Sequence, residues 1–440
     1  MDAASSYHAA RAPIDTLPNE LLSNIFTMGA ASPPSYWGRL PFALLVSSIS
    51  RRWRETAISA PPLWSQLFFT ADPRSDSWCA DLFLLRSGAH PLDISINLLN
   101  RPGSADIVRK LLPYSERWRK LCIRVADKHE VLIIMPSIRY TSVPLLQHFE
   151  LGFGGKCNTI GVLHGVHTAF FEPGAPALTS VKLRGLCLDC APPLANLTSY
   201  RFDSKAIAMT QSHMESIATA SPALRVLNLR FKSFEAFGSG SINLPSLCDL
   251  SLNFRHCPRV DGADPLHILA IMLAPALESL ELVSLQDYDV RDLSASLESF
   301  PNYYLRPQTL KLSCITGWAL QDALLGLFPT VTSLYLLGTP VQPTLSLLPI
   351  LKSITYNHGI GPWYPAPVNE RDDACILWLC RHVQDCHGTP RAMEYVRIGS
   401  SVCGFGQLGD PGEAHYRALR NLVDLVELPY SADSLRDSWS

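Results

Sequence analysis

The stretch that decides the organisation of this chain is residues 14–26, which read IDTLPNELLSNIF. Pro18 suits the first position of a helix, because an N–H there would have no partner and the φ of proline is already helical. Glu20 places a negative charge in the first turn, beside the positive end of the helix dipole. Apolar residues recur at helical spacing, and two more widen the stripe: Leu17, Leu21, Ile25 and Met28, with Leu22 and Phe26 beside them. The stretch predicts an amphipathic helix.

A second helix is predicted over residues 46–57. Its apolar residues share one face and its arginines face outward, and Pro61 and Pro62 then end it, with Leu63 and Trp64 folding back as an apolar cap. A segment of about 50 residues has too little core volume to bury so much apolar surface. Part of that surface is therefore expected to meet a partner.

The pattern L-P-x-E-L-L-x-x-I-F at 17–26, followed by I-S-R-R-W-R at 49–54 and P-L-W at 62–64, resembles the F-box, in particular the F-box-like proteins of fungi. The resemblance covers residues 14–65 and implies a three-helix module that docks on the Skp-type adaptor of Skp–cullin–F-box ubiquitin ligases. By matching positions, the residues expected to face the adaptor are Leu17, Pro18, Leu21, Ile25, Ile49, Trp53 and Trp64.

Two features depart from that family. The spacer at 27–41 is longer than the motif usually allows, which leaves the middle helix open, and Ile49 stands where the family more often carries valine. The alternative, from the residues alone, is an unrelated pair of amphipathic helices.

Behind this segment, helix-and-strand couplets are predicted at 75–96 and 107–125, and a repeated unit follows. It has the form Pro-x-apolar-x-x-apolar-x-apolar and occurs at 144–151, 176–183, 222–229, 245–252, 275–282, 329–336 and 349–356, with weaker copies ending at 202, 312 and 398. Most steps are about 19 to 32 residues, near the about 20–29 of leucine-rich repeats, and longer steps can absorb an outer helix. Residues 252–261 and 310–317 resemble the cysteine-containing leucine-rich repeat, a type common behind F-boxes.

The fold class predicted is therefore α/β, with a three-helix F-box module followed by an irregular leucine-rich-repeat αβ solenoid. The expected divisions are a disordered N-terminus at 1–13, the F-box-like domain at 14–65, the solenoid at 66–430 and a tail at 431–440. A doubly wound α/β domain is the alternative to the solenoid.

In a leucine-rich solenoid, the residues between the paired apolar positions point to the concave strand face and are candidates for substrate binding. The positions predicted are Arg184, Arg201, Arg230, Asn253, Lys311, Tyr335 and Asn357, a series that grades from basic to polar or aromatic. The long step between residues 356 and 396 carries Trp363 and Tyr364 and a predicted helix at 368–386. These two aromatics either serve as binding anchors or seal the end of the solenoid core.

Patterns that would indicate chemistry are weak. The G-x-G-x-x-G at 404–409 follows its strand too late, and Asp410 would repel a phosphate, so a loop is expected. Cys187 and Cys190 lack a second pair of ligands, and Cys187 is expected to be a buried ladder residue. The dense group on the 368–386 helix is read as an apolar helix face in preference to a metal site: Cys375, Cys380, His382, Cys386 and, just beyond, His387. No catalytic constellation is found, so neither an enzyme nor a cofactor or metal is expected.

Composition narrows the function further. A formal charge of −2 gives no excess of positive charge for binding nucleic acid or an anionic membrane. The longest apolar runs are shorter than the about 20 residues that a membrane span needs. The polar N-terminus lacks the apolar core of a signal peptide, so a cytoplasmic or nuclear location is expected, with the twelve cysteines mostly as buried thiols. The function predicted is the substrate-receptor subunit of a Skp–cullin–F-box-type E3 ubiquitin ligase, with the adaptor, a cullin and an unknown protein substrate as partners. The alternative is a non-ligase scaffold for protein–protein interaction.

Overall fold

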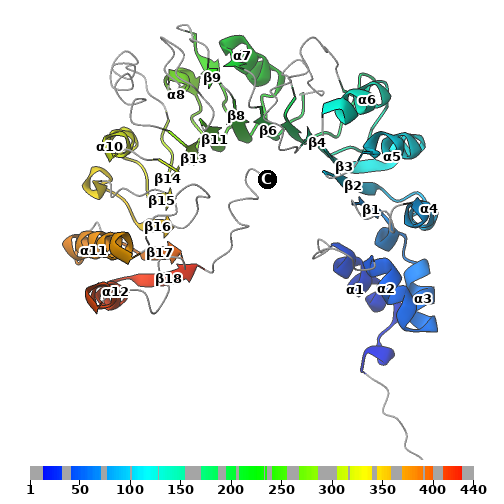
Figure 1. Cartoon of the computed structure of the whole chain (residues 1–440), viewed down its shortest axis with the longest axis horizontal. Helices are drawn as coiled ribbons and strands as arrows, with labels where there is room; N and C mark the ends of the chain where they lie inside the picture. Colours follow the sequence, from blue (N-terminus) through cyan, green and yellow to red (C-terminus); the bar gives the residue numbers. More distant parts are fainter. Residues whose placement is uncertain are drawn as a thin grey trace, which may run out of the picture. The chain divides into compact units, whose positions relative to one another are not determined.

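The computed structural model divides the chain into two compact units. Unit 1 holds residues 1–157 and 167–178, and unit 2 holds residues 158–166 and 179–440. Each unit contains a parallel sheet with helices on one face (Figure 1). The residues that the structure describes are 13–31, 41–70, 77–99, 102–126, 128–153, 170–186, 195–204, 208–231, 233–234, 240–254, 267–285, 305–315, 318–338, 344–357, 369–389, 392–399 and 410–428.

Unit 1 begins with a helical segment. Its elements are η1 (Pro13–Thr16), α1 (Asn19–Ala31), α2 (Phe42–Ile49), α3 (Arg51–Ile58) and η2 (Pro61–Trp64). The prediction of a helix that starts next to Pro18 is confirmed by α1. The predicted end of the second helical stretch before Pro61 is also confirmed, since α3 ends at Ile58. The middle helix that the spacer had left open is α2.

The prediction of one continuous helix over residues 46–57 is wrong. Ser50 is extended, with φ −152° and ψ 167°, and its Oγ accepts a hydrogen bond from the Trp53 N–H at 3.1 Å. A serine in this position ends α2 and caps α3, because its side chain satisfies an N–H that has no partner within the helix. Because of this break, the exposed residues of α2 do not continue onto one helical face with those of α3, as they would in a single helix.

In the part of unit 1 that the structure describes, the sheet has four parallel strands in chain order: β1 (Gln66–Phe69), β2 (Leu92–Leu98), β3 (Trp118–Val125) and β4 (His148–Phe153). The helical connections are α4 (Ser77–Arg86), α5 (Ser104–Leu111) with η3 (Leu112–Arg117), and α6 (Lys128–Arg139). Alternate strand residues are buried beneath these helices, as in β2, where Leu92, Ile94, Ile96 and Leu98 are at most 1% exposed. The strand and helix predicted in each of the first two couplets are confirmed.

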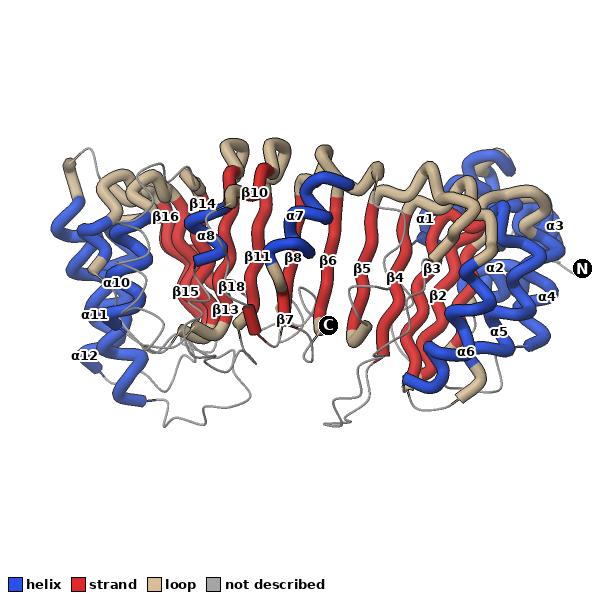
Figure 2. Tube along the Cα trace, turned by 90° about the horizontal axis from the view of Figure 1, so that it is seen from above, coloured by secondary structure: helices blue, strands red, loops and turns tan. Residues whose placement is uncertain are grey.

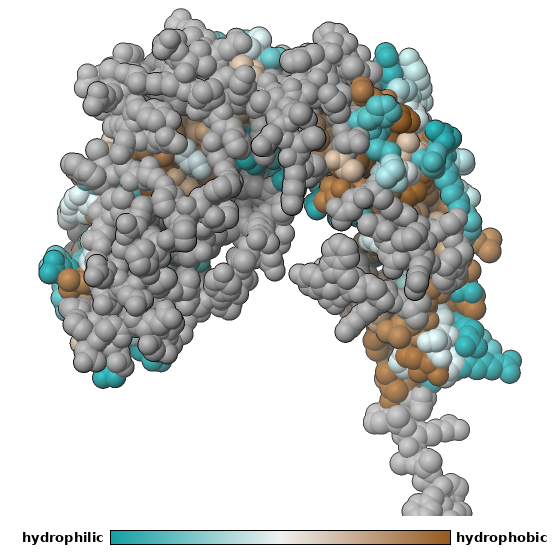
Figure 3. Space-filling view, viewed as in Figure 1, coloured by the Kyte–Doolittle hydropathy of each residue, from teal (hydrophilic) through white to brown (hydrophobic). Residues whose placement is uncertain are grey.

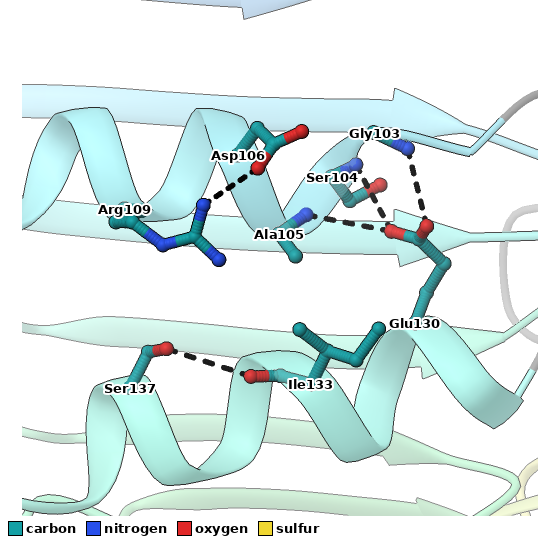
Figure 4. A network of polar contacts seen from close by, with 8 residues as sticks. All are labelled: Gly103, Ser104, Ala105, Asp106, Arg109, Glu130, Ile133 and Ser137. Carbon is teal, nitrogen blue, oxygen red and sulfur yellow. Dashed lines mark hydrogen bonds and ion pairs between the residues drawn. The ribbon is translucent and has the colours of Figure 1, made fainter.

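A buried carboxylate joins α6 to α5. Glu130 Oε1 accepts from the Gly103 N–H at 3.1 Å, and Oε2 accepts from the N–H groups of Ser104 and Ala105 at 3.0 and 3.4 Å (Figure 4). These N–H groups stand at the start of α5, where a helix leaves its first donors unpaired and where negative charge is favoured. Glu130 thus ties α6, which packs on β3 and β4, to the start of α5.

Within the described residues, the main sheet of unit 2 has ten strands, paired in parallel and in chain order: β5 (Ser180–Arg184), β6 (Ser199–Asp203), β8 (Val226–Arg230), β11 (Asp249–Asn253), β13 (Ser279–Val283), β14 (Thr309–Ser313), β15 (Ser333–Leu337), β16 (Ser353–Asn357), β17 (Tyr395–Gly399) and β18 (Asp424–Leu428). Figure 2 shows them side by side, and in Figure 1 the helices lie on one face. These helices are α7 (Gln211–Ala220), α8 (His267–Ile271), α10 (Trp318–Leu327), α11 (Asn369–Cys386) and α12 (Asp410–Leu422).

Short elements accompany the main sheet of unit 2. Two-stranded pairs form between β7 (Ala208–Met209) and β9 (Ser233–Phe234), and between β10 (Ile242–Asn243) and β12 (Met272–Leu273), and η5 (Leu345–Leu347) precedes β16. A doubly wound fold reverses its strand order at a switch point. The strand order within each unit follows the chain without such a reversal, which argues against that alternative.

The proline of the repeated unit has a structural cause. In each of the seven strong copies it is the second residue of a turn closed by a backbone hydrogen bond, such as Leu224 N–H to Ser221 C=O at 3.1 Å around Pro222. This position of a β-turn favours proline, whose φ is already set. The donor of each turn is the first apolar residue of the copy, and all seven are buried: Leu146, Leu178, Leu224, Leu247, Leu277, Val331 and Leu351.

The paired apolar positions form two continuous rows in the core of unit 2. In the second row Leu229 pairs with Leu252, Leu252 with Leu282, and Leu282 with Leu312, each 0% exposed. A strand of five residues cannot bury its side chains alone, but stacked neighbours can. The predicted positions of the repeat strands are therefore confirmed, and β18 adds a strand that the repeat pattern did not predict.

Candidate functional site

The helical segment of unit 1 exposes a row of aliphatic side chains. On α1, Leu21, Ile25 and Met28 are 48%, 41% and 68% exposed, and on α2, Leu45 and Ile49 are 49% and 56% exposed. These five residues are called the aliphatic stripe. Figure 3 shows hydrophobic residues gathered over this segment, with hydrophilic ones at its outer edge. Contiguous exposed apolar surface of this kind marks an interaction site more often than a passive surface.

The sequence had placed all apolar residues of α1 on one widened face, and the structure separates them. Leu22 and Phe26 are buried, at 0% and 1% exposed, and Phe26 packs on Trp53 of α3 with 4.9 Å between ring centroids. Leu21 and Ile25 lie on the neighbouring side of the helix and stay exposed. One side of α1 therefore builds the module, and the other remains available.

The α1 residues and the α2 residues of the aliphatic stripe adjoin because the two helices approach closely beside them. A Cβ at Gly29 would lie only 2.4 Å from Cζ of Phe42, so the ring sits directly on the glycine. Ile25 is one turn before Gly29, and Leu45 is one turn after Phe42, so both lie on the sides of their helices next to this contact. The exposed residues thus form one surface across the α1–α2 junction.

An arginine holds the start of α1 in place. Arg52 of α3 donates from Nε to Asn19 Oδ1 at 2.9 Å and from Nη2 to the carbonyl oxygen of Leu17. Leu17 is half-buried and Pro18 is exposed, so the two residues stand at the edge of the stripe. These two hydrogen bonds give Arg52, the second arginine of the I-S-R-R-W-R motif, a positioning role.

Two predicted adaptor-facing residues occupy other places. Trp64 is 0% exposed, its Nε1 donates to the Ala57 carbonyl oxygen at 2.7 Å, and the Arg86 guanidinium lies 4.3 Å from its ring centroid. Its assignment to the adaptor-facing surface is therefore corrected: the indole is part of the core. Trp53 is half-buried through its contact with Phe26 and offers only part of its ring. Met28 and Leu45, which the assignment left out, belong to the exposed surface.

The second candidate surface is one face of the unit 2 sheet. The described helices of unit 2 lie on the other face, so this surface is called the helix-free face. The prediction that all seven residues lie between the paired apolar positions is wrong for four of them, and the residues fall in two rows of the register. Arg201, Lys311 and Tyr335 lie between the paired apolar positions, and Arg184, Arg230, Asn253 and Asn357 lie just after them. Lys311 and Tyr335 are direct partners, with the Lys311 Nζ 5.7 Å from the ring centroid.

The charge on this face differs from the predicted gradient. Asp203 pairs in register with both Arg184 and Arg230, with its Oδ2 3.2 and 3.4 Å from their guanidinium nitrogens. The Arg230 side chain is only 9% exposed, so this arginine belongs to a structural ion pair more than to an open basic surface. Glu281 adds a further acid and accepts from Ser251 Oγ at 2.6 Å.

Sequence reasoning missed several residues of the middle row. They are Lys182, Asn228, Ser251, Glu281, Thr355 and Arg397. Strict alternation within each strand would have identified them, because the residue between two inward leucines must point to the opposite face. The predicted anchors Trp363 and Tyr364 lie outside the described residues.

The dense cysteine and histidine group yields a pair. Cys386 Sγ lies 3.7 Å from His382 Nε2 on α11, and burial lowers the pKa of His382 from its ordinary value while Asp385 opposes this. Cys380 is buried, and burial raises the pKa of its thiol. The predicted helix over 368–386 is confirmed as α11, whereas the side chain of Cys375, residues Cys187 and Cys190, and the glycines at 404–409 lie outside what the structure describes.

A different set of metal-ligating side chains comes together in unit 1. Cys122 on β3 and His148 and Glu150 on β4 have ligand atoms within 4.8 Å of one another. No motif indicated this group, because its members come from two strands and the H-x-E pair is hidden inside a repeat. Among the residues that the structure describes, this is the one group of at least three histidine, cysteine or acidic side chains whose ligand atoms come so close together.

Comparison with known proteins adds no family. No model of a known protein family matches the chain, and no curated protein matches it. Across the described part of the chain, no helix combines the length and the apolar character that crossing a membrane requires.

Proposed function

We propose that this chain is the substrate-receptor subunit of a Skp–cullin–F-box-type E3 ubiquitin ligase. In this proposal the helical segment of unit 1 is an F-box-like module that binds the Skp-type adaptor, and the repeats form an irregular leucine-rich-repeat solenoid that binds a protein substrate. The chain carries out no chemistry. It raises the effective concentration of the substrate beside a ubiquitin-loaded enzyme, which the adaptor and the cullin bring close.

The observation that carries the proposal is the aliphatic stripe. Five aliphatic side chains stay exposed on two short helices that already have a packed interior of Leu22, Phe26 and Val46. Burying apolar surface is worth about 25 cal/mol per Å², so covering this stripe would contribute substantially to association. An unpartnered surface of this kind, next to a motif that resembles the F-box, favours docking of an adaptor.

The substrate side of the proposal rests on the helix-free face of unit 2. Its middle row mixes cations, an acid and an aromatic, and a mixed polar surface with an aromatic anchor suits a folded or extended protein better than a phosphate backbone. We place the substrate-binding surface around Arg201, Lys311 and Tyr335. Arg184 and Arg230 support this surface through Asp203.

Co-expression with a Skp-type adaptor tests the function. The variant Leu21→Ser, Ile25→Ser, Ile49→Ser removes most of the stripe without touching the buried residues, and we expect it to fold but to lose co-purification with the adaptor. The matched control is Leu85→Ser on α4, where the leucine is 79% exposed but lies outside the stripe. Equal adaptor recovery by the triple variant and the wild type would contradict the proposal.

A second measurement separates the ligase from the scaffold. A ligase subunit should bring down the cullin through the adaptor, and proteasome inhibition should increase the recovered substrates. Adaptor binding without a cullin would favour the non-ligase scaffold and overturn the ligase assignment.

A further inference from the structure

The geometry of Cys122, His148 and Glu150 points to a metal site, and we propose that these three side chains bind Zn²⁺. The three residues lie on adjacent parallel strands whose backbones stand about 4.8 Å apart. Cys122 is the direct register partner of Glu150, and His148 lies two residues before Glu150 on the same face of β4. Their ligand atoms already lie within 4.8 Å of one another.

The donor set suits zinc. A thiolate, an imidazole and a carboxylate are the protein ligands of Zn²⁺, with bonds of about 2.0 to 2.3 Å, so donors on one tetrahedron stand about 3.3 to 3.8 Å apart. A closure of about 1 Å through side-chain rotation therefore completes the arrangement. Three protein donors leave a fourth tetrahedral position for water or an external ligand.

The surroundings of the three donors favour a fixed site. Cys122 and Glu150 are buried, at 8% and 9% exposed, so neither side chain is a mobile surface group. Arg124 donates from Nε to Glu150 Oε1 at 2.7 Å and holds the carboxylate in one orientation, as outer-shell partners of metal ligands do. Helix α6 packs on both β3 and β4, and its Glu130 in turn binds the start of α5.

The local charge permits a divalent ion. A thiolate and a carboxylate together balance the two charges of Zn²⁺, and the cations Arg124 and Lys120 alternate with Cys122 along β3. Lys120 is exposed, and its long side chain can direct the ammonium group into solvent. The site lies on the face of the sheet opposite Leu121 and Ile123, so binding does not disturb the core.

The test uses the full-length chain with Zn²⁺ and with Co²⁺ as a spectroscopic probe. We expect about one zinc per chain after dialysis, and a thiolate-to-cobalt charge-transfer band with the visible spectrum of a tetrahedral site. Cys122→Ser, His148→Gln and Glu150→Gln should each weaken binding by at least about 100-fold, because even outer-shell changes cost about 10- to 100-fold. Cys248→Ser and His90→Gln should leave it unchanged.

Two further readouts keep the outcome decisive. Zn²⁺ should raise the melting temperature of the wild type but not that of His148→Gln. His148 is half-buried, so this variant still gives an answer if Cys122→Ser, at a buried position, fails to fold. Zn²⁺ should also protect Cys122, but not Cys248, from alkylation. Equal zinc retention by the ligand variants and the controls, or alkylation of Cys122 unaffected by zinc, would overturn the site.

Discussion

The ring of Phe42 lies against the backbone of Gly29, and a Cβ at Gly29 would stand 2.4 Å from its Cζ. This contact joins the end of α1 to the start of α2, next to the exposed residues that we propose as the adaptor surface. Glycine is needed here for the close approach of a side chain, because its backbone has an ordinary helical conformation. The junction is therefore a point where a single methyl group tests the packing.

Gly29→Ala is expected to destabilise the protein. The added methyl group must displace the Phe42 ring at a cost of about 1–3 kcal/mol, which exceeds the about 0.5–1 kcal/mol that alanine gains over glycine in a helix. Gly326→Ala in α10 is the matched control, since a Cβ there meets nothing within 4 Å and should stabilise. Thermal unfolding measures both, and a Gly29→Ala variant as stable as Gly326→Ala would contradict the contact.

The sequence revealed the helical segment and the repeat strands because their signals are local. Pro18 starts a helix, Pro61 ends one, and each repeat proline occupies a turn position that favours it. It did not reveal the break at Ser50, because the hydrophobic period continues across residues 46–57. It also assigned Trp64 to a surface, since an apolar residue beside a motif looks the same whether it docks on a partner or on α4.

Residues that depend on pairing between strands were the hardest to predict. Asp203 neutralises Arg184 and Arg230 only because β6 lies between β5 and β8, a neighbour relation that no single strand encodes. The group of Cys122, His148 and Glu150 likewise exists only through the register of β3 with β4. α6 was not predicted either, since Pro136 lies inside it and a proline usually indicates a helix end.

Glu130→Ala is expected to loosen unit 1. It leaves the first N–H groups of α5 without their carboxylate partner, and charge-assisted hydrogen bonds of this kind contribute about 1.5–3 kcal/mol each in buried settings. Hydrogen exchange should report faster opening of α5 and α6, whereas Glu116→Ala in η3, an exposed position, should not change it. Unaltered exchange at α5 in Glu130→Ala would show that the cap contributes nothing.

Leu252→Ala should destabilise unit 2 by about 2–5 kcal/mol, because it opens a cavity in a fully buried row. The loss should spread to the strands of Leu229 and Leu282, which share its interfaces. Denaturant unfolding gives the free energy, and hydrogen exchange shows the spread. Leu347→Ala is the control at a 38% exposed position. A purely local loss would mean that the strands do not stabilise one another.

His382 should make the stability of unit 2 depend on pH. Its pKa is lowered in the folded chain by burial, so the unfolded chain binds the proton more tightly. Stability contributed by the neutral imidazole is therefore full above the unfolded value of about 6.5 and is lost as pH falls through the folded pKa. Between pH 8 and pH 5, the melting temperature should fall less steeply for His382→Gln than for the wild type. The exposed His387 provides the control variant, and the same slope for His382→Gln and His387→Gln would contradict the assignment.

Asp203→Asn tests whether the basic residues of the helix-free face are held by a structural ion pair. The change keeps the shape of the side chain and removes its charge, so Arg230, with a side chain only 9% exposed, loses its anionic partner. We expect a loss of about 1–3 kcal/mol of unfolding free energy, with Arg184→Ala costing less because Arg184 is more exposed. Asp249→Asn, at an exposed position of β11, should be neutral. If Asp203→Asn left stability unchanged but altered substrate capture, Asp203 would belong to the binding surface itself, and the structural ion pair would be contradicted.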